Sequence, residues 1–223
     1  AVLLGAILMA IGEFIIIGGT EHLMLIGMGA LIIGNGYFKA NISTIVGKLY
    51  KDNDPRRDSG FTIFYIGINI GALLATTVVA FVGETYGFKY GFGLAGIGML
   101  LGLVAFVWGK PLLEGAGEPP NPSELAVKKF MGLSTEWLIY VLTFVGVGVL
   151  WFLIRDEGAV KWVLYSTFAV VYLYIILSSV LTLPPHPRNR IFAALILISV
   201  QVLFWALFEQ AGSSLSLFTD RSV

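Results

Sequence analysis

Seven apolar runs follow one another along this 223-residue chain, and each is about as long as a lipid bilayer is thick. A helix needs about 20 mostly apolar residues to cross the hydrocarbon core of a bilayer. Membrane β-strands are shorter, about 10 residues, and alternate in polarity, whereas these runs are apolar on all faces. The sequence therefore predicts an all-α, polytopic membrane protein, with spans at Ala1–Gly18, Leu23–Tyr50, Gly60–Val82, Tyr90–Trp108, Glu136–Ile154, Val160–Leu183 and Ile191–Phe218.

The composition agrees with a membrane setting and argues against several classes of function. Hydrophobic residues make up 57% of the chain and charged residues 13%, and 14 basic side chains balance 14 acidic ones. A balanced charge gives no reason to expect a nucleic-acid partner. The sequence has no cysteine, no glycine-rich phosphate loop and no metal-ligand spacing. We therefore expect no cofactor, and an intramembrane enzyme is the weakest interpretation.

A Pro- and Gly-rich stretch, Gly115–Ser123, separates the first four runs from the last three and is typical of a linker. The first run begins at Ala1 without an initiator methionine, so we expect a piece of a longer protein. Lys and Arg gather in alternate loops, nine against four, which predicts that loops 48–58, 110–135 and 184–190 face the cytoplasm.

Lys39 lies inside the second apolar run, and this position makes it the first candidate for a functional site. A charged side chain near the middle of a bilayer costs several kcal/mol or more, so such residues usually face a bundle interior or an aqueous cavity. The alternative is a buried ion pair or a side chain that reaches the membrane surface. We interpret Lys39 as a candidate functional-site residue.

Two other runs carry polar side chains at helical spacing. Tyr65 and Asn69 are four residues apart, as are the successive members of the set Gln201, Trp205 and Glu209, so each set lies on one helix face. The alternative for Asn69 and Gln201 is a purely structural hydrogen bond between helices.

Glycine pairs at a spacing of four predict close helix packing. Gly67 with Gly71 and Gly98 with Gly102 have this spacing, and we interpret Gly34–Gly36 as a site of close packing or of local flexibility.

Two further ionisable residues receive a structural interpretation. Glu13 is expected near the extracellular end of the first run, and His22 in a short solvated loop. Neither belongs to a metal-binding or triad pattern.

Three sequence motifs follow one another along the chain. The run Gly34–Ala75 contains FKAN at Phe38–Asn41 and FYIGINIGA at Phe64–Ala72, and FWALFEQAGS lies at Phe204–Ser213. Together these motifs resemble those of a known family, the proton-dependent oligopeptide transporters of the major facilitator superfamily, in which the last one belongs to the seventh helix. The order and spacing of the matches make the resemblance specific.

The resemblance implies a domain layout within a twelve-helix transporter of the cell inner membrane. Residues 1–110 would be the third to sixth helices of the N-terminal bundle and residues 111–135 a cytoplasmic linker. Residues 136–185 would be two extra helices of the bacterial type, and residues 186–223 the first helix of the C-terminal bundle. The remaining N-terminal and C-terminal helices of the layout lie outside these 223 residues.

The same resemblance implies roles for single residues. Lys39 would bind the peptide carboxylate and take part in proton coupling, and Glu209 would carry the proton. Asn69 would hydrogen-bond the peptide, while Tyr65 and Trp205 would line the same cavity.

The function implied is a proton-coupled symporter that imports di- and tripeptides by alternating access, with protons as the coupling ion. One alternative is transport of another small solute or anion, such as nitrate, on the same scaffold. The other is a membrane scaffold that transports nothing, in which the polar residues only hold helices together.

Overall fold

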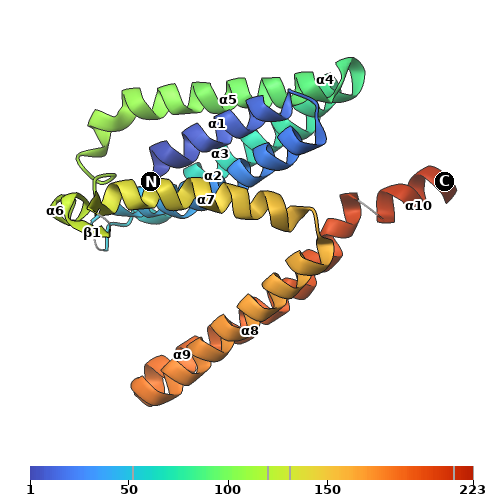
Figure 1. The fold of residues 1–223 in the computed structure, drawn as a ribbon. Helices are drawn as coiled ribbons and strands as arrows, with labels where there is room; N and C mark the ends of the chain where they lie inside the picture. The colour runs from blue at the N-terminus through green and yellow to red at the C-terminus, as the bar shows by residue number, and fades with distance from the viewer. Residues whose placement is uncertain (52, 120, 131, 213, 223) are drawn as a thin grey trace. The chain divides into compact units, whose positions relative to one another are not determined.

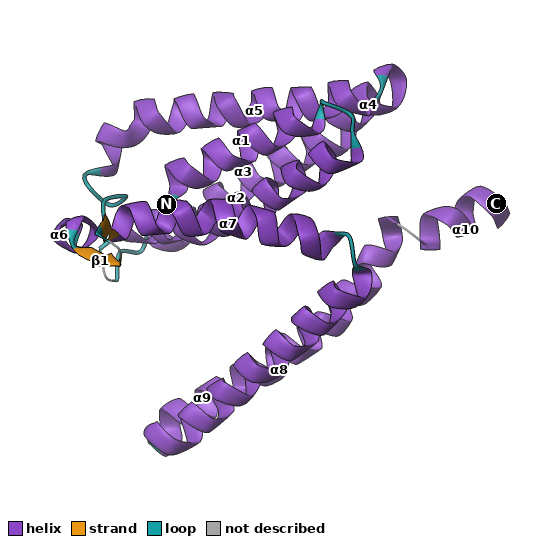
Figure 2. Cartoon of the chain, viewed as in Figure 1, coloured by secondary structure: helices purple, strands orange, loops and turns teal. Residues whose placement is uncertain are grey.

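The computed structural model describes residues 1–51, 53–119, 121–130, 132–212 and 214–222 of the chain. It divides into two compact units, Ala1–Glu157 and Gly158–Val223. Helices account for nearly all of both units, as Figure 2 shows. The prediction of an all-α fold is confirmed.

The first unit contains five helices of 15 residues or more, labelled in Figure 1. They are α1 (Val2–Ile16), α2 (Glu21–Lys48), α3 (Arg57–Leu74), α5 (Phe88–Gly109) and α7 (Thr135–Ile154). A π-helical turn at Ala75–Val79 continues α3 into the short α4 (Ala80–Tyr86). By length and composition, α2, α3 with α4, α5 and α7 can each cross a membrane, whereas α1 is a shorter apolar helix.

The boundary between α1 and α2 differs from the prediction. The Thr20 side chain accepts a hydrogen bond from the Leu23 backbone N–H at 3.3 Å, which starts α2 at Glu21. His22 therefore lies in the first helical turn and not in a loop. Its ring lies beside that of Trp151 of α7, with ring centroids 5.8 Å apart. The placement of His22 in a loop is therefore wrong, whereas its exposure to solvent is confirmed.

The linker between α5 and α7 contains a few short elements of regular structure. A 3₁₀ turn at Lys110–Leu113 follows α5, and Lys110 forms an ion pair with Glu118 at 2.8 Å. The small helix α6 (Pro122–Ala126) leads into a two-stranded antiparallel hairpin of β1 (Lys128–Phe130) and β2 (Leu133–Ser134). The Ser134 hydroxyl then accepts from the Trp137 N–H at 3.3 Å and starts α7.

Glycines make the packing between α1 and α2 close. A Cβ added at Gly12 would lie 2.7 Å from the Gly27 carbonyl oxygen, and one at Gly34 would lie 2.8 Å from that of Gly5. Small residues allow helix backbones to approach in this way. α1 also contacts α5, and α7 contacts α2, so α1 and α2 form the centre of the unit.

The glycine pairs that the sequence singled out do not pack within the described part of the chain. A Cβ at Gly67, Gly71, Gly98 or Gly102 would meet no atom within 4 Å. Close packing at these four positions stays a prediction, because no described helix lies against that face. Close packing is confirmed for Gly34 of the GNG sequence, whereas Gly36 meets no described atom within 4 Å.

The second unit is built on two long helices, α8 (Glu157–Thr182) and α9 (Pro185–Phe208). The Tyr172 hydroxyl of α8 donates to the Leu195 carbonyl of α9 at 3.1 Å and lies 2.7 Å from the Ser199 hydroxyl. A 3₁₀ turn, Glu209–Gly212, and the helix α10 (Ser214–Ser222) follow.

The last span is therefore placed differently from the predicted Ile191–Phe218. α9 begins earlier because Pro185 occupies its first turn, where proline's fixed φ and missing N–H are tolerated. It ends at Phe208, and Glu209 begins the tighter turn.

Candidate functional site

Lys39 lies on a face of α2 that neither neighbouring helix covers. α1 packs on the side of Phe38, whose backbone N–H is 2.8 Å from a Cβ added at Gly5. α7 packs on the side of Tyr37, whose hydroxyl contacts Thr143. At 3.6 residues per turn, Lys39 points roughly 100° away from Phe38 and roughly 160° away from Tyr37. Its side chain is exposed.

A second polar residue on this open face is Asn35, which the sequence interpretation missed. Asn35 is also exposed and lies one turn before Lys39. The signal was the same spacing of four that picked out Tyr65 and Asn69. Asn35 and Lys39 together give α2 a short polar stripe.

Tyr65 and Asn69 are both exposed on α3, a helix that has no buried residue. The Asn69 side-chain amide donates to the Tyr65 backbone carbonyl at 2.8 Å, within the same helix. This bond leaves the amide one N–H and its carbonyl oxygen for another partner. The described residues give Asn69 this hydrogen bond within its own helix, and the structural alternative stays open.

Lys39 and Asn69 lie at matching positions along α2 and α3. α2 and α3 meet near their connecting loop, where a Cβ added at Gly47 would lie 3.5 Å from Cζ of Phe61. Each site residue is eight positions from this contact, or about 12 Å along its helix. Lys39 and Asn69 are therefore equally far along their helices from this contact, and Tyr65 lies one turn nearer the loop than Asn69.

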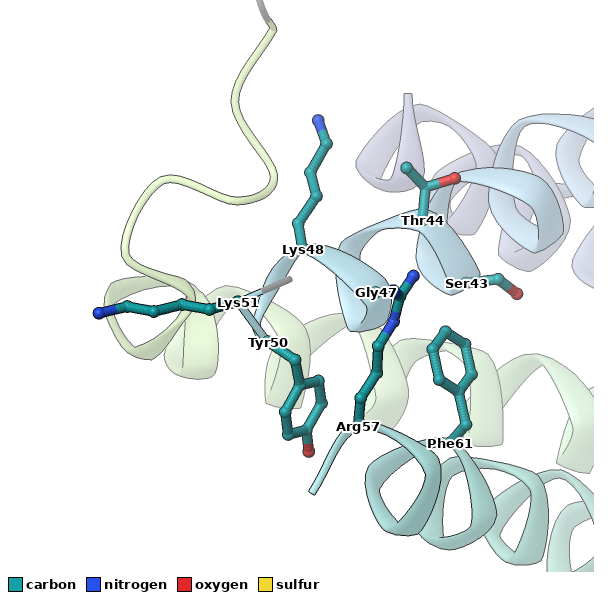
Figure 3. A pocket seen from close by; sticks show the side chains of 8 residues that line it. All are labelled: Ser43, Thr44, Gly47, Lys48, Tyr50, Lys51, Arg57 and Phe61. Atoms are coloured by element: carbon teal, nitrogen blue, oxygen red, sulfur yellow. The ribbon is translucent and has the colours of Figure 1, made fainter. Parts of the chain in front are cut away.

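A pocket of about 810 Å³ opens next to this contact, toward the loop (Figure 3). Arg57 and Phe61 extend from α3 toward Gly47 of α2, while Lys48 at the end of α2 and Lys51 in the following loop extend outward. The pocket is lined by Ser43, Thr44, Gly47, Lys48, Tyr50, Lys51, Arg57 and Phe61.

Two hydroxyl groups of this pocket are directed to their own helix. Ser43 donates to the Lys39 carbonyl at 3.1 Å, and Thr44 donates to the Ala40 carbonyl at 2.9 Å. The other polar lining residues are Lys48, Tyr50, Lys51 and Arg57. None of the residues that the sequence selected lines this pocket, so the candidate site remains the open face of α2 with the polar residues of α3.

The loop between α2 and α3 is ordered by one acidic side chain. Asp54 accepts from the Arg56 backbone N–H at 2.9 Å and forms an ion pair with the Arg56 guanidinium at 2.9 Å. The side-chain bond to Arg56, followed by the backbone bond, lowers the pKa of Asp54 from its ordinary value of 3.8.

Trp205 and Glu209 belong to the second unit. Trp205 is 47% exposed and packs edge-on against Phe204 and Phe208 of its own helix. Glu209 begins the 3₁₀ turn, and its backbone N–H donates to the Trp205 carbonyl, so the two residues remain one turn apart. Gln201, on the same helix, is exposed.

The predicted site residues thus form two groups, one in each unit. The first contains Lys39, Tyr65 and Asn69, and the second contains Trp205 and Glu209. In each group the side chains are exposed in the described part of the chain. Within the described ranges, no three His, Cys, Asp or Glu side chains are grouped so that they could hold a metal ion.

Two buried polar features were not found from the sequence. The Tyr37 hydroxyl of α2 lies 2.9 Å from that of Thr143 on α7, and Thr143 is 3% exposed. Glu13, interpreted as a structural residue, packs its Cβ near Gly96 of α5. Its Oε2 atom is buried and has no hydrogen-bond partner in the described part of the chain.

Known proteins resemble the whole chain. The profile of the POT family (PTR2) matches residues 1–223. The uncharacterized transporter YclF of Bacillus subtilis (strain 168) is 35% identical over 92% of this chain and 42% of its own length. Dipeptide and tripeptide permease A of Pectobacterium carotovorum subsp. carotovorum (strain PC1) is 32% identical over 100% of this chain and 43% of its own length. Dipeptide and tripeptide permease B of Edwardsiella piscicida is 31% identical over 99% of this chain and 44% of its own length.

Solved structures give the same result. The crystal structure of peptide transporter POT in complex with sulfate has a TM-score of 0.72 and 31% identity, and covers 99% of this chain and 46% of that chain. A mutant of peptide transporter POT in complex with alafosfalin has a TM-score of 0.72 and 32% identity, and the match covers 98% of this chain and 45% of that chain. The 223 residues span less than half the length of these relatives.

Length, composition and similarity agree. Six helices of the described chain are long and apolar enough to cross a bilayer, which makes this a multi-pass protein of the inner membrane. The family profile covers every residue. The chain belongs to the POT family, a family of membrane transporters and not of enzymes.

Proposed function

We propose that the full-length protein is a proton-coupled symporter that imports di- and tripeptides by alternating access. The observation that carries this proposal is the similarity along the whole chain to two relatives named dipeptide and tripeptide permeases. The open polar faces of α2 and α3 support it, since a transporter needs polar groups that no neighbouring helix has already satisfied.

The first group of residues has the chemistry to hold a peptide. The Lys39 ammonium group offers three donors and no acceptor, which suits the carboxylate of a peptide. Asn69 keeps one N–H and one carbonyl oxygen beyond its bond to Tyr65, a set that matches the C=O and N–H of a peptide bond. Tyr65, 66% exposed, adds a hydroxyl and an aromatic surface.

The second group supplies the proton coupling. The Glu209 carboxyl would take up a proton on the acidic side of the membrane and release it inside, and Lys39 would respond through its own charge. Trp205, one turn before Glu209, would form an apolar wall of the cavity. Inward proton flow supplies about 2.3 kcal/mol per 100 mV of membrane potential, in addition to the pH gradient.

Uptake of di-alanine by the full-length protein in liposomes, driven by an inward proton gradient, tests this function. Lys39→Ala should abolish uptake, while Lys51→Ala, which removes a lysine from the loop, should not. Glu209→Gln should abolish accumulation driven by the gradient but retain exchange of peptide for peptide. Wild-type uptake that ignores the proton gradient would refute the coupling, and full uptake by Lys39→Ala would refute its role.

Transport of another small solute is a second candidate, which one relative favours. The crystal structure of a POT family transporter in complex with 5-aminolevulinic acid has a TM-score of 0.68 and 29% identity to this chain. Competition separates the two candidates. If 5-aminolevulinic acid or nitrate drives proton uptake by the full-length protein and di-alanine does not, the peptide assignment is wrong.

A further inference from the structure

α7 contacts α2 along most of the length of that helix. From the start of α2, His22 contacts Trp151, Gly29 approaches Val147 and Leu150, Ile33 meets Gly146, and Tyr37 meets Thr143. As the residue number of the contact on α2 rises, that of its partner on α7 falls, so the two helices run antiparallel. The α2 positions are separated by seven, four and four residues, which is one continuous stripe of a helix.

Two glycines bring the helices close together. A Cβ at Gly29 would lie 3.2 Å from the Val147 carbonyl oxygen and 3.5 Å from the Leu150 Cβ. From the other side, a Cβ at Gly146 would lie 2.9 Å from the Ile33 Cδ1. Such contacts leave little freedom for α2 to turn about its axis while α7 stays in place.

The polar contact fixes this arrangement further. The Thr143 hydroxyl donates to the Ile139 carbonyl at 2.8 Å, so the 2.9 Å contact has Tyr37 as its donor. Thr143 is almost fully buried. Without the Thr143 hydroxyl, Tyr37, which is half-buried, would lose this hydrogen-bond acceptor, which is unfavourable.

Tyr37 precedes Lys39 by two residues, and the turn of the helix places their side chains on opposite sides of α2. Whatever fixes the rotation of α2 at Tyr37 therefore also fixes the direction in which Lys39 points. We propose that α7 is a permanent part of the bundle that contains Lys39, and that Tyr37, held by Thr143, is a positioning residue for Lys39. The packing part of this proposal is independent of the proposed function. Only the expected effect of a displaced Lys39 on peptide binding rests on that function.

A disulfide across the interface tests whether α7 stays on α2. In the full-length protein without other cysteines, Gly29→Cys with Leu150→Cys should oxidise readily, because a Cβ–Cβ distance of 3.5 Å suits a disulfide. The cross-linked protein should transport as fast as the reduced one. Gly36→Cys with Leu150→Cys is the control and should not cross-link, since Gly36 faces open space. Transport that stops on oxidation and returns on reduction would overturn the proposal.

A second experiment tests the positioning of Lys39. Thr143→Val should raise the KM for di-alanine about fivefold, the worth of one hydrogen bond, with kcat little changed. Thr143→Ser keeps the hydroxyl group and should restore the wild-type KM. In a Lys39→Ala background, measured by binding of the peptide, Thr143→Val should have no further effect. A similar loss in that background would show a general structural role and overturn the proposal.

A third measurement does not depend on the substrate. With Lys39→Cys, the rate of labelling by a water-soluble maleimide reports how position 39 faces water. Thr143→Val should change this rate severalfold, whereas Thr143→Ser should not. An unchanged rate would refute the positioning role even if peptide transport is confirmed, and a changed rate would support it even if the substrate is not a peptide.

Discussion

α2 and α3 carry the polar residues of the first unit, yet they are held in different ways. α2 is packed by α1 on one side and α7 on another, and its buried residues include Gly27, Gly29 and Gly34. Among the described residues, α3 has no buried residue, and it meets α2 near their loop. Within this part of the chain, α2 presents Lys39 between two packed neighbours, whereas α3 presents Tyr65 and Asn69 as a loosely packed helix.

The difference shows that a glycine motif leads to close packing only where a partner helix lies against it. Gly67 and Gly71 of α3 have the spacing typical of membrane helix contacts, but open space surrounds them in the described chain. Gly12 and Gly27 face each other across α1 and α2, where each leaves room for the other's backbone. The π-helical turn at Ala75–Val79 adds a local irregularity to the loosely packed helix, and such turns are frequent at functional sites.

The largest effect should come from filling the α1–α2 contact. In Gly27→Ala, the new methyl group would lie 2.6 Å from the Gly12 carbonyl oxygen, a backbone atom that cannot move aside cheaply. We expect the free energy of unfolding to fall by about 1–3 kcal/mol, the usual cost of overpacking. Thermal unfolding of the purified full-length protein measures this loss.

Gly67→Ala is the matched variant on α3. It should change the free energy of unfolding by no more than about 0.5 kcal/mol, as at an exposed position. If both variants lose the same stability, α3 is packed as tightly as α2 in the full-length protein and the contrast between the helices is wrong.

The sequence predicted the helices better than their ends. Apolar length alone located all seven helical segments, because only a helix or a closed barrel satisfies the backbone in lipid. The start of α9 was missed because the prolines near Pro185 were taken for a loop, although proline is favoured in a first turn. α9 ends at Phe208 because the backbone changes there from an α-helix to a 3₁₀ turn. Hydropathy carries no signal for this change.

For the candidate site, the sequence identified the polar residues but not the contacts that hold their helices in place. The cost of a charge in the membrane was enough to select Lys39, and spacing was enough to select Tyr65 with Asn69. The Tyr37–Thr143 contact joins residues 106 positions apart, and nothing local to either residue marks it. The domain layout and the roles of the five site residues stay predictions.

A smaller effect is expected from Asn69 on the loosely packed helix. Asn69→Ala removes one amide that is exposed and bonded only to its own helix, so stability should be nearly unchanged. Peptide affinity should fall about tenfold, the worth of roughly one good hydrogen bond. Binding of di-alanine by calorimetry, beside thermal unfolding, checks both statements. Asn69→Asp keeps the acceptor and should lose less affinity than Asn69→Ala; a large loss of stability in either would show that α3 is held through Asn69.

The smallest effect should come from the loop that joins the two helices. Asp54 is an acid whose pKa is lowered by its bonds to Arg56, so the ionised form is favoured in the folded protein. Its contribution to stability is therefore present above the ordinary value of 3.8 and is lost as the pH falls through the lower folded value. Thermal unfolding at pH 7 and near pH 3 should differ slightly less in Asp54→Asn than in the wild type. Arg56→Gln should reduce the difference in the same way, because it removes the partner and leaves the carboxyl; if it does not, the loop is ordered by something other than this ion pair.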